Sequence, residues 1–473
     1  MSKEKALDWI IKNDSRLIEI SDRIWNFAEV GLQEFQSAAI LADELEKEGF
    51  LVEREVAGMP TAFVATWGTG KPVIGIMGEY DALAGLSQKV KPTKESIEQG
   101  KPGHGCGHNI IGTAGLGAAI AVKAALETTG KAGTIKYFGC PAEETMVGKI
   151  FMVRDGLFDG LDATLESHPS AIHGILDGNY LAMNSVKFTF YGVSAHAAAN
   201  PDQGRSALDA VELMNTGVNY LREHVNQEAR IHYVITDGGG QPNVVPPRAQ
   251  SWYYIRAPKR NQVEHIYERI LNIAKGAALM TETTHDVEFL TGCYEALPNI
   301  ALNDLIEQNM KTIGPPQHTK EEKKFAKKLS KSISPEMKKD ALMNFKLDNW
   351  HEKMDVDLDR DIIRLPSDIL FSGSTDVADV SWVTPTSHFF ISSNVLGAPG
   401  HSWQVVVTSG MSIGHKSMLY GAKVMAATAM DLMNSPEELA KVKDEFTTAT
   451  RGFTFKSALP PDLKPPLDHV PKS

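Results

Sequence analysis

Apolar positions recur along the chain with two different periods, and each period predicts a type of element. Through residues 4–50 they return every three to four positions, as at Leu17, Ile20 and Ile24, which predicts helices. Short apolar runs typical of buried strands follow at 62–67, 73–78 and 134–139, with a small-residue helical stretch at 111–127. Strands alternating with helices predict an α/β domain with a mostly parallel central sheet flanked by helices.

The pattern changes near residue 182. Strand-like runs at 185–191, 230–235, 249–256 and 285–291 enclose helical stretches at 204–224 and 261–280. The order strand–helix–strand–strand–helix–strand predicts a ferredoxin-like α+β unit. We expect this smaller domain, 184–293, to be inserted between two parts of the catalytic domain, 1–183 and 294–445.

The remaining segments predict further helices, two strands and a tail. Residues 299–365 are mostly helical and charged, with a helical insertion at about 315–365, and 320–332 has the pattern of a solvated helix face. Strands are predicted at 388–392 and 403–408 and a helix at 411–433. The tail, 446–473, is proline-rich and predicts extended chain.

Composition narrows the class of protein. The 473 residues carry a formal net charge of −11, which argues against a nucleic-acid partner. The N-terminus has no apolar core of signal-peptide type, and no stretch reads as a membrane span. Three cysteines make no disulfide framework. We expect a cytoplasmic protein with no membrane or nucleic-acid partner.

Groups able to bind metal gather where the predicted strands end. In GHGCGHN, residues 103–109, glycines allow Cys106 and His108 to turn toward one point. An incidental Cys and His at a Gly-rich helix entry explain the motif equally well. In PAEE, a metal ion would explain the adjacent Glu143 and Glu144, one as ligand and the other as base toward water. A helix N-terminus, where acids are favoured, is the alternative.

Three more residues follow the same pattern. His168 comes after a strand-like run, His401 lies in a glycine loop, and Asp81 in GEYDAL is placed to orient a ligand imidazole. Cys, His and carboxylate donors together suit zinc or manganese.

These segments, in this order, resemble the amidohydrolase branch of metallopeptidase family twenty, which includes aminoacylases, carboxypeptidase G, hippurate hydrolases and auxin-conjugate hydrolases. The resemblance covers about residues 15–435. It rests on GEYDALAGLSQ, GHGCGHN, PAEET, GVSAHAAANPDQGRSALDA, QPNVVP, GSTDVADVSW and GHSWQ. It implies a two-metal catalytic domain with a smaller lid domain that also forms a dimer contact.

The resemblance also implies roles for individual residues. The metal ligands would be Cys106, His108, Glu144, His168 and His401, around two divalent ions, Mn²⁺ or Zn²⁺. Glu143 would be the general base, and Asp81 the orienting carboxylate. His196 would reach a partner active site and steady the oxyanion, while Asn243 and Arg256 would grip the substrate carboxylate. Ser374 and Thr375 are expected to line the substrate pocket.

The sequence also departs from the auxin-conjugate hydrolases. Asn109 stands where they carry Asp, and Glu79-Tyr80-Asp81 replaces their Asp-Met-Asp. Both changes match the aminobenzoyl-glutamate-cleaving subgroup of the family. His104 is left outside the metal shell, because its family counterpart is not usually a ligand.

The expected reaction is hydrolysis of the amide bond of an N-acyl amino acid, with p-aminobenzoyl-glutamate as the favoured substrate. Dipeptides or other amino-acid conjugates are the alternative. A cysteine-nucleophile amidase built on Cys106 and a non-catalytic binding relative remain open, while a zinc deaminase lacks its HxE and PCxxC pairing. We expect a homodimer through the lid domain or a heteromer with a related subunit.

Overall fold

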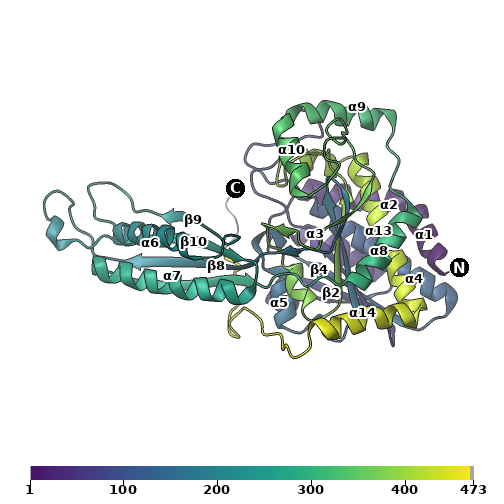
Figure 1. The fold of residues 1–473 in the computed structure, drawn as a ribbon, viewed down its shortest axis with the longest axis horizontal. Helices are drawn as coiled ribbons and strands as arrows, with labels where there is room; N and C mark the ends of the chain where they lie inside the picture. The colour runs from purple at the N-terminus through teal and green to yellow at the C-terminus, as the bar shows by residue number, and fades with distance from the viewer. Residues whose placement is uncertain (1, 469–473) are drawn as a thin grey trace.

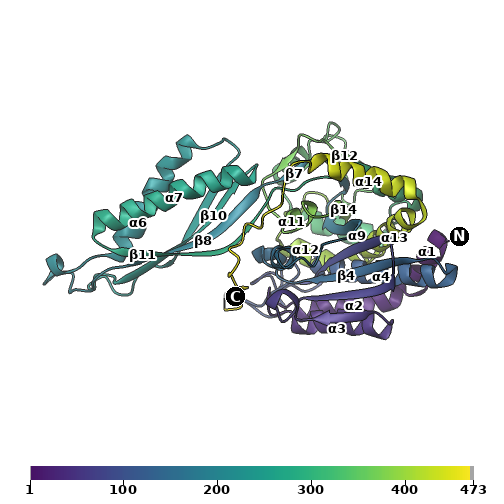
Figure 2. The same ribbon diagram turned by 90° about the horizontal axis from the view of Figure 1, so that it is seen from below.

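The computed structural model describes residues 2–468 and has two parts (Figure 1). The larger part is a sheet covered by helices and contains the N-terminus. The smaller part projects from it and consists of helices α6 and α7 on an antiparallel sheet (Figure 2). The end of the predicted tail, 469–473, lies outside the described residues.

The larger part is organised by an eight-stranded sheet with the order β1-β2-β4-β3-β5-β14-β6-β12. Its centre, β4-β3-β5-β14, is parallel, and β1 and β2 add antiparallel strands at one side. The strands are β1 Leu51–Arg54, β2 Phe63–Thr69, β3 Val73–Glu79, β4 Gly133–Cys140, β5 Ala163–Ser170, β6 His173–Leu176, β12 Ile362–Leu365 and β14 Thr386–Ser392. The predicted α/β class is therefore confirmed.

Helix α4, His108–Thr129, is the centre of the main core. It packs against α1, α13 and strand β3. By length and composition α4 is apolar enough to cross a membrane, but 89% of its most apolar window is buried inside the protein. Small residues such as Gly115, which lies against the Met77 carbonyl, let this helix lie close on the sheet. The helix is therefore a core element of this fold.

Other helices surround the large sheet and its edges. They are α1 Ser2–Lys12, α2 Asp14–Phe27, α3 Phe35–Lys47, α5 Gly148–Arg154, α8 Ile300–Ile313, α9 Lys320–Leu329, α10 Pro335–Asn344, α11 Val377–Ser381, α12 Trp403–Ser409, α13 Ser412–Asn434 and α14 Pro436–Ala449. A small parallel pair, β7 Asn179–Tyr180 and β13 Leu370–Phe371, lies apart from the two larger sheets.

The smaller part has the predicted strand–helix–strand–strand–helix–strand order. Its antiparallel sheet has the order β11-β8-β10-β9. The elements are β8 Ala182–Tyr191, α6 Ala207–Leu221, β9 Arg230–Asp237, β10 Arg248–Ala257, α7 Arg260–Thr281 and β11 Thr284–Cys293. Strand β10 alternates buried and half-buried residues, because one face lies on the apolar core shared with α6 and α7.

One predicted strand is wrong. Residues 403–408 form helix α12, not a strand. The β-branched run Val405-Val406-Val407 favours a strand locally, but every residue from Gln404 to Ser409 is buried, and tertiary packing decides the conformation. Trp25 fixes the helix by donating its indole N–H to the Val406 carbonyl at 2.9 Å. His168, expected after a strand, lies within β5.

Candidate active site

The parallel strands bring the predicted site residues to one edge of the sheet. Strand β3 ends at Glu79 and is followed by Asp81, and β4 ends at Cys140, just before Glu143 and Glu144. His168 lies near the end of β5, and His108 begins α4. Since the carboxyl ends of parallel strands meet at one edge, segments distant in sequence converge there.

Glycines allow the Cys106 loop to pass close to its neighbours. Gly107 has a φ of +82°, which side-chain-bearing residues rarely adopt. A Cβ on Gly105 would lie 2.4 Å from a Leu86 methyl carbon. The Gly105 carbonyl accepts a hydrogen bond from the His401 N–H at 3.1 Å. The loop therefore holds His401 beside Cys106.

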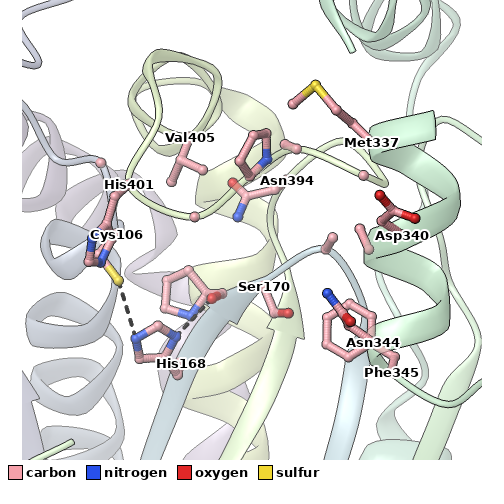
Figure 3. Close-up of a pocket in the computed structure, with 18 of the residues that line it drawn as sticks. Cys106, His168, Ser170, Met337, Asp340, Asn344, Phe345, Asn394, His401 and Val405 are labelled. Atoms are coloured by element: carbon pink, nitrogen blue, oxygen red, sulfur yellow. Dashed lines mark hydrogen bonds between the residues drawn. The ribbon is translucent and has the colours of Figure 1, made fainter. Parts of the chain in front are cut away.

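The structure brings all five predicted ligands together. The Cys106 sulfur lies 3.5 Å from His168 Nε2, and His401 Nε2 lies 3.2 Å from a Glu144 oxygen (Figure 3 shows Cys106, His168 and His401). Donor atoms lie within 4.8 Å of one another in each of three groups. These groups are Cys106-His108-His168, Cys106-Glu144-His401 and Glu79-His108-Glu143.

Asp81 is in contact with two of these residues. One of its oxygens lies 2.8 Å from His108 Nδ1, and the other accepts the Glu144 backbone N–H at 3.0 Å. With Nδ1 directed at Asp81, His108 presents Nε2 to the cluster. Nε2 and Glu144 Oε1 are buried, and among the described residues neither has a hydrogen-bond partner. Buried polar atoms normally have partners, so these two atoms fit a metal-ligand role.

The electrostatics also fit a cation at this place. Burial and the neighbouring Glu79 carboxylate raise the pKa of Glu143 well above its usual range. Burial raises the pKa of Glu144 to about 7, with Asp81 and Glu79 adding to the effect of burial. A divalent cation would relieve this crowding of carboxylates. His104, by contrast, donates its Nε2–H to the Ile24 carbonyl at 3.0 Å, away from the cluster.

Sequence reasoning missed a buried charged group behind the cluster. The Lys149 ammonium lies 2.5 Å from Glu79, 2.7 Å from Asp376 and 3.9 Å from Glu166. Glu79 in turn lies 3.2 Å from His108 Nε2, so this group adjoins the candidate ligands. A lysine followed by the apolar run IFMV in a short helix (GKIFMVR) was the available signal.

The predicted substrate-binding residues fall into two places. Arg256, on β10, points its guanidinium Nε at the Ser374 hydroxyl, 3.3 Å away, and lies over the Tyr254 ring at 5.0 Å. Burial lowers the pKa of Arg256 from its usual value. Thr375 is buried, and its hydroxyl accepts the Val377 N–H at 3.3 Å.

His196 and Asn243 lie together on the exposed surface of the smaller part. His196 Nδ1 accepts the N–H groups of Ala198 and Ala199, at 3.3 and 3.1 Å, so the ring proton belongs on Nε2. The Asn243 carbonyl accepts the Ala197 N–H at 2.9 Å. Within residues 2–468 neither side chain contacts the metal cluster of its own chain.

A cavity of about 550 Å³ opens beside the cluster (Figure 3). Cys106, His168 and His401 line one side of it, and residues of α10 line the opposite side. A molecule bound in the cavity would therefore contact both the candidate ligands and α10.

Comparison with known proteins places the chain among hydrolases. The family model described as Peptidase family M20/M25/M40 matches residues 75–450. A subunit of the p-aminobenzoyl-glutamate hydrolase of Escherichia coli is 43% identical over 97% of both chains. The Xaa-Arg dipeptidase of Mus musculus is 30% identical over 94% of this chain and 92% of its own.

Solved structures share the fold at low sequence identity. An aminobenzoyl-glutamate utilization protein from Klebsiella pneumoniae has a TM-score of 0.61 at 18% identity, covering 90% of this chain and 97% of its own. A dinuclear metal-binding peptidase of the M20 family from Bacillus subtilis has a TM-score of 0.57 at 14% identity, covering 89% and 98%. At these identities the two comparisons show a shared fold and no more.

Proposed function

Because the chain belongs to peptidase family M20/M25/M40, we propose that this hydrolase is a metal-dependent amidohydrolase that cleaves N-acyl amino acids. The observation that carries the proposal is Glu143 beside a converging donor set in which His108 Nε2 and Glu144 Oε1 are buried without a hydrogen-bond partner among the described residues. The favoured substrate is p-aminobenzoyl-glutamate, giving p-aminobenzoate and glutamate, in line with the 43% identity to a component of that hydrolase. Dipeptides are the second choice, in line with the Xaa-Arg dipeptidase.

Cys106, His108, Glu144, His168 and His401 would hold two divalent ions, Mn²⁺ or Zn²⁺. When bound, they supply Lewis acidity toward the amide carbonyl and the attacking water. Asp81 holds His108 with Nε2 directed at the cluster. Glu79, which lies 3.2 Å from the same nitrogen, is a further candidate ligand.

The protein's own side chains perform the proton transfers and hold the substrate. Glu143 accepts the proton of the attacking water and returns it to the leaving nitrogen. His196 Nε2–H donates to the carbonyl oxygen as negative charge develops there. Arg256 and Asn243 bind the free carboxylate of the amino acid and set the scissile bond against Glu143.

A cysteine-nucleophile mechanism is disfavoured by the surroundings of Cys106. Burial, followed by the Glu144 charge, raises the pKa of the Cys106 thiol to about 12. Burial lowers the pKa of His168, whose Nε2 lies 3.5 Å from the Cys106 sulfur, to about 4. A thiolate–imidazolium pair of the kind such enzymes use is therefore unfavourable between Cys106 and His168. Chelation of metal abolishes activity under the metal mechanism and spares it under the thiol mechanism.

The proposed assembly is a homodimer formed through the smaller part. Among the described residues, its edge strand β9 has no neighbour on one side and exposes Val234 and Ile235, at 57% and 44%. A dimer also explains why His196 lies away from the cluster of its own chain. A heteromer with a related chain is the alternative, since the relatives include two different components of one hydrolase. The three free cysteines fit a reducing, cytoplasmic location.

The variant Glu143→Gln tests the proposal. It keeps the shape of the side chain and removes the base, so we expect kcat to fall by about 10²–10⁴-fold. Metal content, measured by elemental analysis, should stay that of the wild type. Full turnover in this variant with metal bound would contradict the mechanism.

A further inference from the structure

Helix α10 presents one face to the cavity beside the candidate metal ligands. Met337, Asp340, Ala341 and Asn344 all line this cavity. Their spacing of three, four and seven residues places them on the same side of a helix. Figure 3 shows this face opposite Cys106, His168 and His401. The helix comes from the segment of the chain whose role the sequence left unassigned.

The opposite side of α10 anchors the helix. Leu342 is completely buried in an apolar cluster with Leu347 and Phe390. Lys338 is buried as well, and its ammonium donates to the Val356 carbonyl at 2.5 Å. A Cβ on Gly397 would lie 2.8 Å from the Lys338 side chain, so the backbones approach closely there. The cavity-facing side of α10 is therefore held in a fixed orientation.

The cavity wall combines aromatic rings with hydrogen-bond acceptors. Phe345 and Phe371 meet edge to face, with ring centroids 6.3 Å apart. The exposed Asp340 carboxylate and Asn344 amide line the same cavity, and neither side chain has a hydrogen-bond or ion-pair partner among residues 2–468. None of the described residues that line the cavity is Lys or Arg. This surface suits an apolar body that ends in a hydrogen-bond donor.

The cavity is suited to the acyl end of the substrate. Arg256, the proposed carboxylate clamp, lies at Ser374, and neither residue lines this cavity. Cys106, His168 and His401 line it directly, so an amide held at the cluster has α10 on its other side. With the free carboxylate held at Arg256, the acyl group would extend toward α10.

We propose that the α10 face is an acyl-group subsite in which Asp340 accepts a hydrogen bond from an amine at the far end of the acyl group. An arylamine and a primary alkyl ammonium are two sources of this donor. The aromatic pair Phe345 and Phe371 favours the arylamine, whose ring it contacts. The inference rests on the proposed function and names the part of the substrate that α10 selects.

The test compares substrates with and without the amine. We expect wild-type kcat/KM to be about 10-fold higher for p-aminobenzoyl-glutamate than for benzoyl-glutamate, the size of one hydrogen bond to a charged group. Asp340→Ala should remove most of this preference, and Asp340→Asn, whose amide oxygen still accepts a hydrogen bond but carries no charge, should remove part of it. The same comparison of kcat/KM for 6-aminohexanoyl-glutamate and hexanoyl-glutamate tests a primary alkyl ammonium as the donor.

Glu336→Gln is the matched control, because Glu336 is a carboxylate on the same helix that does not line the cavity. It should keep the wild-type preference. A ratio that is unchanged in both Asp340 variants would overturn the subsite. If no N-acyl amino acid is hydrolysed, the proposed function fails, and the subsite is then tested by calorimetric binding of p-aminobenzoate against benzoate. Equal affinities for the two in the wild type would overturn the subsite by itself.

Discussion

Lys149 is buried completely beside the candidate metal site, where its ammonium faces three carboxylates. Asp376 contacts Lys149 at two points, because it also accepts the Lys149 backbone N–H at 2.9 Å. Burial by itself would raise the pKa of Glu79. The Lys149 charge is the largest effect in the opposite direction, and the pKa of this carboxyl is lowered to about 2. Lys149 therefore keeps a carboxylate ionised next to His108.

Replacing Lys149 by Met should destabilise the protein strongly. Removing one partner of a buried ion pair leaves the other charge uncompensated, which typically costs about 3–5 kcal/mol. Urea unfolding of the metal-free protein measures the loss. The control is Lys47→Met, which removes a lysine that is 67% exposed and paired with Glu44, and which should cost less than about 1 kcal/mol. Equal losses in the two variants would contradict this account of the buried group.

The limits of sequence reasoning at this scale are physical. Cys106, His108, Glu143 and Glu144 stand out because their motifs place reactive groups next to glycines or at strand ends. Lys149 stands out only as a lysine next to an apolar run, and the sequence does not show its role, because its partners Asp376 and Glu166 belong to other segments of the chain. Only the packed sheet brings them within ion-pair distance.

Among the elements, those with a clear period were predicted well and those decided by packing were not. The order of β8, α6, β9, β10, α7 and β11 follows from alternating and helical patterns. Helix α12 was predicted as a strand because its residues are buried on all sides and leave no period. Helix α14 was missed, although Ser435 and Pro436 mark its start, with the Ser435 hydroxyl accepting the Glu438 N–H at 3.3 Å.

Helix α14 matters because it caps another helix. Glu445 accepts the N–H groups of Ile300 and Ala301, at 2.8 and 2.7 Å, in the first turn of α8. Those groups have no partner within α8, and a carboxylate there is favoured by the helix dipole. Glu445→Ala should destabilise the protein by about 1 kcal/mol and speed hydrogen exchange at residues 300 and 301. Asp444→Ala, one residue away and exposed, should change neither quantity.

At the scale of the whole molecule, the proposed catalytic groups are divided between the two parts. Glu143 and the candidate ligands lie at the edge of the large sheet, while His196 and Asn243 lie on the surface of the smaller part. If His196 serves its own chain, the smaller part must move toward the sheet. If His196 serves the site of a partner chain, the dimer brings it there without this movement of the smaller part.

Mixing two inactive variants separates these possibilities. Glu143→Gln removes the base and His196→Ala removes the oxyanion donor, so each should be nearly inactive alone. If each His196 serves the partner chain's site, a mixed dimer has one site that combines the intact Glu143 of one chain with the intact His196 of the other. Random pairing then restores activity to about a quarter of the wild-type sites. No chain carries both intact groups, so a site built within one chain regains nothing.

The control for this experiment mixes Glu143→Gln with the double variant Glu143→Gln/His196→Ala. Neither chain then has a base, and activity should stay absent under either arrangement. Exchange of chains between dimers must be verified by mass spectrometry of the mixture, because unmixed dimers also show no recovery. Recovered activity would assign His196 to the partner's site and make the dimer the catalytic unit. Its absence in verified mixed dimers would contradict the shared site and require the smaller part to close over its own chain.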